Sequence, residues 1–462
     1  MEPSEVIFQP LKFRNLTVSN RLFRSSISGR IDNYDGSGTL ARINFEKQFA
    51  AGGVGAIISS HVPIAVRGRV LPNYAMIDRD ARIPFWRELI RQVHEYDCKY
   101  IVQLSYAGRQ NDIRGIENAP HPTLSATGRT GRFHGLRAQA MTKADIKRIQ
   151  RLFAEAAGRA RDAGADGLEL HSSNGYLFTQ FLSSAINDRK DEYGGSLENR
   201  ARFMLEVIAA VRAEVGADMF LCAKLNGRDL HNAGTLPLEW KRGNSLQDAI
   251  SVARWVEAAG VDAIHVSRGS WFPHPHNPAG PIDWRYTSGP YEAMLAQGKH
   301  TARNYLLFRT PGLRLFPAAM WARTQGAFVK GRRAIPEKIE GLNAADARAI
   351  KAAVKIPVLC TGGWQTASRI ARAISDGDCD AVTIARPLLA NPDLPHILRS
   401  GKDGPEPGKR CTYCNKCLVN VLEYPLGCYE VDRFAEHGED AYDRMIEQVM
   451  SIYEDEVPTH AG

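Results

Sequence analysis

The sequence predicts a (β/α)8 TIM barrel with a long insertion after its sixth strand and a short cysteine-rich extension at its C-terminal end. Short apolar or β-branched runs alternate with longer amphipathic stretches eight times along the 462 residues, and this alternation is typical of a closed parallel barrel. An open doubly wound sheet would need a glycine-rich dinucleotide turn, and no G-x-G-x-x-G follows any of these runs. We therefore expect the barrel over residues 1–400, with the insertion at 271–336, and the extension over 401–462.

Each expected strand is a short apolar run, and two of the expected helices begin with a capping signal. The strand runs are 21–28, 54–59, 100–104, 167–171, 219–225, 262–267, 356–361 and 380–385. The clearest amphipathic stretches are 142–163, 197–215, 245–259 and 366–375. Thr142 is followed three residues later by Asp145, and Ser196 precedes a Leu-Glu-Asn-Arg run, so both are expected to start helices.

Polar residues stand where the strands end, which is where barrel enzymes place their chemistry. These residues are Ser28, Ser60, Gln103, His171, Lys224, Ser267, the pair Gly362 and Gly363, and Arg386. The last two strands usually form a phosphate-binding corner, because glycine lets backbone amides approach a ligand and an arginine can hold its oxygens. Convergence of these strand ends on one mouth predicts a binding site there.

The composition predicts a soluble protein of the cytoplasm. Hydrophobic residues make up 44% and charged residues 24%, no apolar run reaches the length of a membrane span, and the opening Met-Glu-Pro-Ser-Glu is no signal peptide. The formal net charge of +8 fits an anionic cofactor, an acidic redox partner or a plain solvated surface. No basic run with interleaved aromatic residues indicates binding to nucleic acid.

Four cysteines near the C-terminal end form a metal-binding pattern. Two residues separate Cys411 from Cys414 and Cys414 from Cys417, and the loop to Cys428 supplies a fourth thiol. Four sulfurs at this spacing suit an iron–sulfur cluster or a tetrahedral zinc ion. A disulfide is disfavoured, because thiols stay reduced in the cytoplasm. Spacing alone leaves iron–sulfur and zinc open.

Two stretches depart from the regular alternation. Residues 271–336 are too many for one strand-to-helix connection, and they are rich in aromatic residues and arginines. A loop of this size over a barrel mouth is usually a lid or a binding loop, and an insertion that pairs subunits in a homo-oligomer is an equal alternative. Residues 120–136 read as a surface loop, because Pro, Thr, Gly and Arg dominate them.

Two long motifs resemble the old yellow enzyme family of FMN-dependent oxidoreductases. The first starts at His171 and reads H-S-S-N-G-Y-L-F-T-Q-F-L-S-S, and the second starts at Asn187 and reads N-D-R-K-D-E-Y-G-G-S-L-E-N-R. Shorter matches are Asn20-Arg21, Q-L-S-Y-A-G-R from Gln103, and A-R-P-L-L-A-N-P-D from Ala385. The similarity runs over about residues 5–430 and implies a barrel that binds FMN.

The resemblance implies a flavin contact for each of several strand ends. Ser28 falls where the family has a Thr or Cys that bonds the flavin carbonyl, and Gln103 falls where a Gln binds the pyrimidine edge. Lys224 takes the place of the usual Arg near the flavin N1. The residues that match the phosphate-binding corner are Gly362, Gly363, Ala385 and Arg386.

The resemblance also implies the substrate residues. His171 and Asn174 match the pair that binds a substrate carbonyl oxygen, and Tyr176 matches the proton donor. Not every member of the family has this pair. Dienoyl-CoA reductase, a member that also contains an iron–sulfur cluster, lacks the His/Asn pair and has its catalytic His near the positions of His274 and His276. Tyr106 replaces the His that the family usually has in its QLxHAGR motif.

The cysteine motif resembles the branch of the family that contains trimethylamine dehydrogenase and dienoyl-CoA reductase. Members of that branch hold a four-iron, four-sulfur cluster beside the flavin, which favours iron–sulfur over zinc. They also have nucleotide-binding domains after the cysteines, where this sequence ends. We therefore expect a separate one-electron partner of the ferredoxin or flavodoxin kind, unless NADH or NADPH reduces the FMN directly.

These observations predict an enone or enoate reductase that uses FMN and a 4Fe-4S cluster. The main alternative is the same scaffold working oxidatively, as an amine dehydrogenase or demethylase. Trimethylamine dehydrogenase has a Tyr-x-x-His pair where this chain has His171 and Asn174, which disfavours amine oxidation. An alternative of another class is a flavin electron carrier whose cysteines hold structural zinc.

Overall fold

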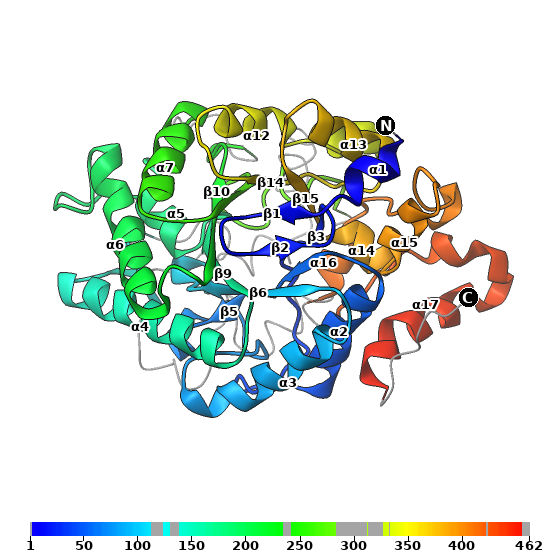
Figure 1. Cartoon of the computed structure of the whole chain (residues 1–462), viewed down its shortest axis with the longest axis horizontal. Helices are drawn as coiled ribbons and strands as arrows, with labels where there is room; N and C mark the ends of the chain where they lie inside the picture. Colours follow the sequence, from blue (N-terminus) through cyan, green and yellow to red (C-terminus); the bar gives the residue numbers. More distant parts are fainter. Residues whose placement is uncertain are drawn as a thin grey trace.

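Eight parallel strands close into a barrel in the computed structural model, which describes residues 2–111, 123–129, 138–233, 242–282, 312, 327–331, 333–421 and 424–454 (Figure 1). The strands are β3 (Leu22–Arg24), β4 (Ala56–Ile58), β6 (Lys99–Ser105), β9 (Gly167–Ser172), β10 (Phe220–Asn226), β11 (Ala263–Ser267), β14 (Val358–Thr361) and β15 (Ala381–Ile384). Each is paired with the next in this order, and β15 pairs with β3 to close the ring. The predicted barrel is confirmed.

Helices follow the strands and cover the outside of the barrel. They are α2 (Leu40–Ala51), α3 (Ile83–Val93), α4 (Lys143–Asp162), α5 (Leu177–Leu182), α6 (Leu197–Val215), α7 (Leu246–Ala258), α12 (Ala344–Lys351) and α13 (Ala367–Ser375). Thr142 caps α4 in a reciprocal pair with Asp145, and the Ser196 hydroxyl accepts a hydrogen bond from the backbone of α6. Both predicted helix starts are confirmed.

The strands are buried on both faces, as their continuous apolar composition requires in a barrel filled by side chains and covered by helices. A hairpin near the N-terminus, β1 (Leu11–Lys12) with β2 (Thr17–Val18), closes the end of the barrel opposite the strand carboxyl ends. Its Phe13 ring packs edge-on against Phe220 with the ring centroids 4.8 Å apart. Because apolar side chains close that end, we expect a ligand at the other mouth.

The chain after the last barrel strand packs back onto the barrel. Its elements are α14 (Arg386–Ala390), α15 (Leu394–Arg399), α16 (Lys416–Asn420), α17 (Ala441–Met450) and the 3-10 segments Pro407–Lys409, Val431–Asp440 and Ser451–Tyr453. The last described residues run along α2, where the Asn44 amide donates to the carbonyls of Ile452 and Glu454, and α17 lies close to α2 in Figure 1. Of the predicted insertion, residues 271–282 and 333–336 are described with a few others. Most of it, like most of 120–136, lies outside the described residues.

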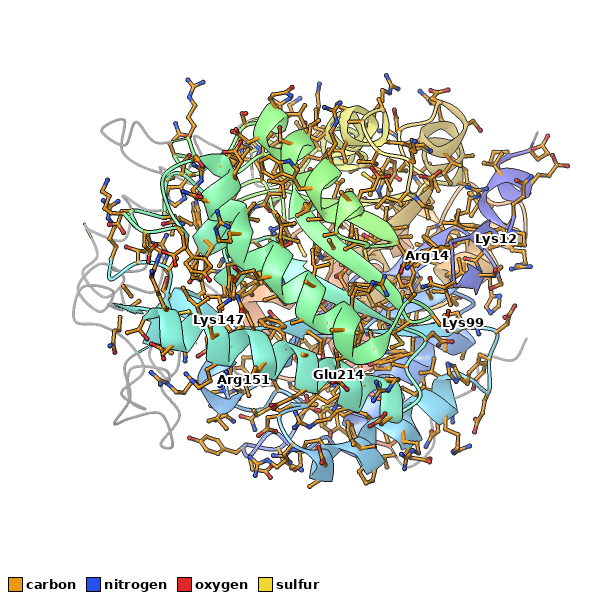
Figure 2. The ribbon with its side chains drawn as sticks, turned by 60° about the vertical axis from the view of Figure 1, so that its left-hand side comes forward. Lys12, Arg14, Lys99, Lys147, Arg151 and Glu214 are labelled. Carbon is orange, nitrogen blue, oxygen red and sulfur yellow. The ribbon has the colours of Figure 1, made fainter. Side chains whose placement is uncertain are left out.

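Charged side chains cover the outer face formed by α4 and α6, where Lys147, Arg151 and Glu214 project from the helices (Figure 2). Lys147 pairs with Glu206 at 3.1 Å, and on neighbouring elements Lys99 pairs with Asp166 at 3.3 Å. Exposed pairs of this kind add little stability, so this face has the character of a solvated surface. None of the described helices combines the length and apolar character that a bilayer crossing requires.

Candidate active site

A cavity of about 320 Å³ opens at the carboxyl ends of the barrel strands. Many predicted site residues line it: Ser28, His171, Asn174, Tyr176, Lys224, Gly362, Gly363, Ala385 and Arg386. The described part of the insertion contributes another wall with residues 272–273, 276–279 and 282, and the cysteine-rich extension contributes Cys417 and its neighbours. The cavity is therefore built from the strand ends, the insertion and the extension together.

Gln103 lies beneath the cavity rather than in its wall. Its side-chain oxygen accepts a hydrogen bond from the Ser26 hydroxyl at 2.9 Å, and Ser26 itself lines the cavity. Its amide nitrogen donates to Glu169 at 2.6 Å. The residue expected at the pyrimidine edge is thus held in the barrel interior, with Ser26 between it and the ligand space.

A buried polar network continues from Glu169 across the barrel. The second carboxylate oxygen of Glu169 bonds His265 Nδ1 at 2.6 Å, and His265 Nε2 reaches the hydroxyls of Thr361 and Thr383 at 2.7 and 2.8 Å. Burial raises the pKa of Glu169, but His265, Lys224 and Gln103 together outweigh burial and leave the pKa lowered. Glu169 and His265 were not among the residues expected from the sequence, although a charged residue inside an apolar strand is a usable signal.

Lys224 supplies a buried positive charge to the cavity wall. Burial lowers its pKa, and the charge of Glu169 partly offsets that effect. Among the described residues Lys224 forms no direct ion pair, so Glu169 attracts it only from a longer distance. A buried cation with so little compensation is costly unless an anion joins it. An anionic ligand, such as a reduced flavin ring, would satisfy this charge.

His171 and Tyr176 meet in one aromatic group with His61. The Tyr176 ring lies 4.7 Å from His171 and 4.9 Å from His61, measured between centroids. Burial lowers the pKa of His171 well below its usual range and raises that of Tyr176. At neutral pH the cavity therefore holds a neutral imidazole and a protonated phenol. His61 follows the second strand by three residues, so extending the strand-end search slightly would have found it.

Asn174 is already hydrogen-bonded within the protein. Its side-chain nitrogen donates to the Arg268 carbonyl at 3.1 Å and to the Ser267 hydroxyl at 3.4 Å, and its oxygen accepts from Ser173 at 2.7 Å. The residue has a left-handed backbone, with φ +61°. The contact with Ser267 is long and therefore weak. A substrate oxygen could replace the Ser267 hydroxyl as the acceptor of this hydrogen bond.

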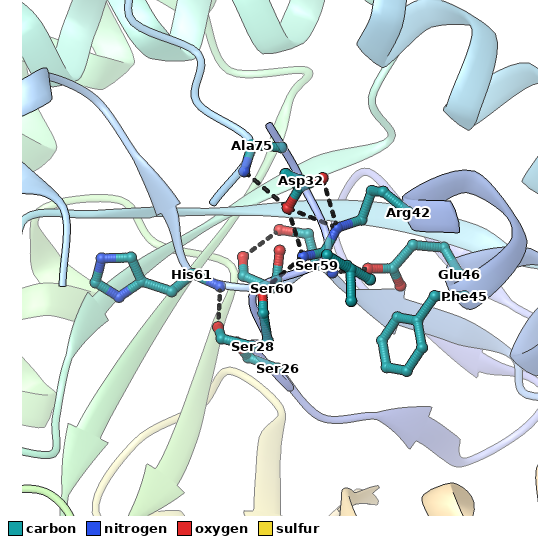
Figure 3. A network of polar contacts seen from close by, with 12 residues as sticks. Ser26, Ser28, Asp32, Arg42, Phe45, Glu46, Ser59, Ser60, His61 and Ala75 are labelled. Atoms are coloured by element: carbon teal, nitrogen blue, oxygen red, sulfur yellow. Dashed lines mark hydrogen bonds and ion pairs between the residues drawn. The ribbon is translucent and has the colours of Figure 1, made fainter. Parts of the chain in front are cut away.

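Ser28 stands beside a buried group of charges. Its hydroxyl accepts a hydrogen bond from the His61 backbone at 2.9 Å (Figure 3). Behind it, Arg42 is held by Asp32 at 2.7 Å and by Glu46 at 3.5 Å, all with fully buried side chains. Asp32 also accepts from the Ala75 backbone at 2.9 Å (Figure 3). These bonds fix the chain that follows β3, and with it Ser28.

The cysteine loop lies close to the same cavity. Burial raises the pKa of Cys417 well above its usual range, and the neighbouring Cys414, Cys428 and Cys411 raise it further. The four thiols are thus near enough to interact electrostatically, which suits a shared cation. Within the described chain, however, no three His, Cys, Asp or Glu side chains form a ready metal-binding group. The set of donors fits a metal centre, while the ligand geometry is not formed.

The sequence model of the family described as "NADH:flavin oxidoreductase / NADH oxidase family" matches residues 6–288. The chain belongs to this family. Members are flavin-dependent oxidoreductases. The match therefore confirms the predicted family and the predicted class of FMN-dependent oxidoreductase.

Relatives within this family match different shares of the chain. An NADH oxidase from Thermoanaerobacter brockii is 28% identical over 92% of the chain and 57% of its own length. An NADPH dehydrogenase from Geobacillus sp. is 33% identical over 58% of the chain and 74% of its own length. A 2-naphthoyl-CoA reductase complex has the same fold, with a TM-score of 0.72, 23% identity, and coverage of 92% of this chain and 56% of that one. The chain therefore spans little more than half the length of the NADH oxidase.

Proposed function

We propose that the protein is an FMN-dependent ene-reductase that reduces a C=C bond conjugated to a carbonyl group, an enone or an enoate. The observation that carries this proposal is the meeting of His171, Tyr176 and Lys224 in one cavity. It places a neutral hydrogen-bond donor, a protonated acid and a cation around one space. The names of the relatives favour NADH or NADPH as the donor of reducing equivalents.

The residues present fit FMN. Gly362, Gly363 and Ala385 provide backbone at the phosphate corner, with Arg386 beside them, and Lys224 provides the charge near the ring. When bound, FMN supplies the hydride. The cavity residues then have two tasks, which are to hold the substrate carbonyl and to deliver a proton.

His171 holds the substrate oxygen as a neutral donor, and Asn174 adds its loosely bonded N–H. These bonds strengthen as negative charge develops on the oxygen, so they stabilise the transition state more than the ground state. Tyr176 gives its proton to the α-carbon. Its raised pKa keeps the phenol protonated until that moment, and a positioned acid of this kind contributes roughly 10²–10⁴-fold to the rate.

Release of FMN tests the cofactor assignment. Protein denatured by heat is expected to release FMN, and Arg386→Ala is expected to weaken FMN binding by roughly tenfold or more, because the phosphate loses a charge-assisted partner. Flavin fluorescence measures both. Arg348→Ala removes an exposed arginine that pairs with Asp378 outside the cavity and is expected to bind FMN normally. Denatured protein that yields no FMN would refute the whole site.

An anaerobic substrate screen separates reduction from oxidation. Protein supplied with NADH, NADPH or reduced ferredoxin is expected to reduce enones and to leave methylated amines untouched. Oxidation of the amines with no turnover of enones would favour the amine dehydrogenase alternative instead.

Metal analysis tests the cysteines. We propose that Cys411, Cys414, Cys417 and Cys428 hold one 4Fe-4S cluster, so protein purified without oxygen is expected to contain about four irons per chain. Cys417→Ser is expected to lose most of this iron. The control Cys98→Ser, at an isolated buried cysteine, is expected to keep it. Stoichiometric zinc without iron would show instead that the cysteines form a structural zinc site.

A further inference from the structure

Tyr413 and Asn415, which lie between the cysteines, have almost completely buried side chains. Their exposed fractions are 0% and 1%, and both have a left-handed backbone, with φ of +55° and +61°. Left-handed backbone is costly for residues other than glycine. Contacts elsewhere must hold these two residues in place.

The first set of contacts reaches Arg386 at the end of β15. Arg386 Nη1 donates to Asn415 Oδ1 at 2.7 Å and to the Ala279 carbonyl at 2.7 Å, with a longer contact to the Tyr413 carbonyl at 3.4 Å. The guanidinium also lies over the Tyr413 ring, 5.2 Å from its centroid. No other nitrogen of Arg386 is hydrogen-bonded to a described residue, so Nε and Nη2 are left for a ligand.

The second set of contacts reaches the Gly-Gly turn after β14. The Tyr413 hydroxyl donates to the Gly363 carbonyl and accepts from the Gln365 side chain at 2.8 Å. A side chain at Gly363 would meet the Tyr413 ring at 3.3 Å. Tyr413 therefore packs directly against the turn that forms the phosphate corner.

The third set of contacts reaches the insertion after β11. The Asn415 amide donates to the carbonyls of Pro278 and Gly280 at 3.3 and 3.2 Å. A Cβ on Gly280 would lie 2.1 Å from the Tyr413 carbonyl, so only glycine fits there. The cysteine loop thus joins the segments that follow three successive barrel strands, β11, β14 and β15.

We propose that Asn415 is a positioning residue for the phosphate group of FMN, acting through Arg386. With Nη1 held by Asn415 and Ala279, the arginine presents its remaining donors to the phosphate without first losing rotamer freedom, and such preorganisation favours binding. Order in the cysteine loop thereby sets the affinity for the phosphate end of the flavin. This inference rests on the proposed function, because it requires FMN in the cavity.

The substitution Asn415→Gly tests the inference cleanly, because glycine accepts φ +61° without strain. Its FMN dissociation constant is expected to rise about tenfold, the usual effect of losing a hydrogen bond to a charged group. Riboflavin lacks the phosphate, so its dissociation constant is expected to stay unchanged. Fluorescence titration of flavin-free protein measures both. An equal loss for riboflavin and FMN would overturn the inference, because Asn415 would then only support the cavity as a whole.

A double substitution shows whether Asn415 acts through Arg386. Adding Asn415→Gly to Arg386→Ala is expected to cause no further loss of FMN affinity, because the shared contact is already gone. Additive losses would overturn the inference. Tyr424→Ala, a change in the loop before Cys428 at an exposed side chain, is the control and is expected to bind FMN normally.

Different results would overturn the proposed function and the role of Asn415. Unmodified protein that binds neither FMN nor riboflavin would overturn the proposed function. If the unmodified protein binds FMN and Arg386→Ala weakens it, while Asn415→Gly has no effect, only the role of Asn415 is overturned.

Discussion

Tyr176→Phe is expected to slow the reduction of an enone by roughly 10²-fold or more while flavin reduction stays nearly unchanged. The phenylalanine keeps the ring that packs on His171 and His61 and removes only the hydroxyl. General acid help is worth at least this much. Stopped-flow measurement of the two half-reactions separates the proton-dependent step from the reduction of the flavin.

A matched control is available at Tyr106. This tyrosine is also fully buried and follows a barrel strand, but it does not line the cavity. Tyr106→Phe is therefore expected to leave both half-reactions unchanged. Normal enone reduction by Tyr176→Phe would contradict the assignment. Tyr74 also lines the cavity, and a loss of enone reduction in Tyr74→Phe instead would transfer the acid role to it.

The same residues predict how the rate depends on pH. Burial lowers the pKa of His171 below 6.5 and raises the pKa of Tyr176 above 10. Between these values His171 stays neutral and Tyr176 stays protonated, so neither group changes charge. Neither group is therefore expected to cause a step in the rate of enone reduction from about pH 6.5 to 9.5. A fall at the alkaline end would be assigned to Lys224, whose pKa is lowered by burial, and a step near neutral pH would point to a different acid.

Asp32→Ala is expected to lower the free energy of unfolding by about 3–5 kcal/mol. Asp32 is the nearer of the two carboxylates that hold Arg42, and Glu46, the other, also pairs with Arg24. Removal of Asp32 would leave two fully buried arginines with one carboxylate. Breaking a buried pair is costly, because the remaining charge has no solvent to compensate it. Urea unfolding measures the change.

An exposed ion pair provides the comparison for Asp32. Asp188 pairs with Arg129 at 2.7 Å, with about 39% and 50% of the side chains exposed. Asp188→Ala is expected to cost less than about 1 kcal/mol, since water screens and replaces the lost partner. Equal losses in the two variants would show that burial does not set the strength of the Asp32 contact.

The barrel and the position of its mouth follow from the sequence alone. Parallel strands covered by helices must be apolar along their whole length, so the strand runs were visible, and the capping pairs marked helix starts such as Thr142. The carboxyl ends of such strands meet at one edge, which is why His171, Lys224 and Arg386 could be grouped from their places at strand ends.

What those side chains touch depends on the tertiary structure. Gln103 lies beneath Ser26, Asn174 is engaged with the segment after β11, and one nitrogen of Arg386 is bonded to the cysteine loop. Glu169 and His265 meet across the barrel although they are 96 residues apart. The spacing of residues along the chain predicts local geometry, such as the start of a helix or the end of a strand. These contacts depend instead on how separate strands are placed around a closed ring. That placement follows from the packing of the whole barrel, and no short motif encodes it.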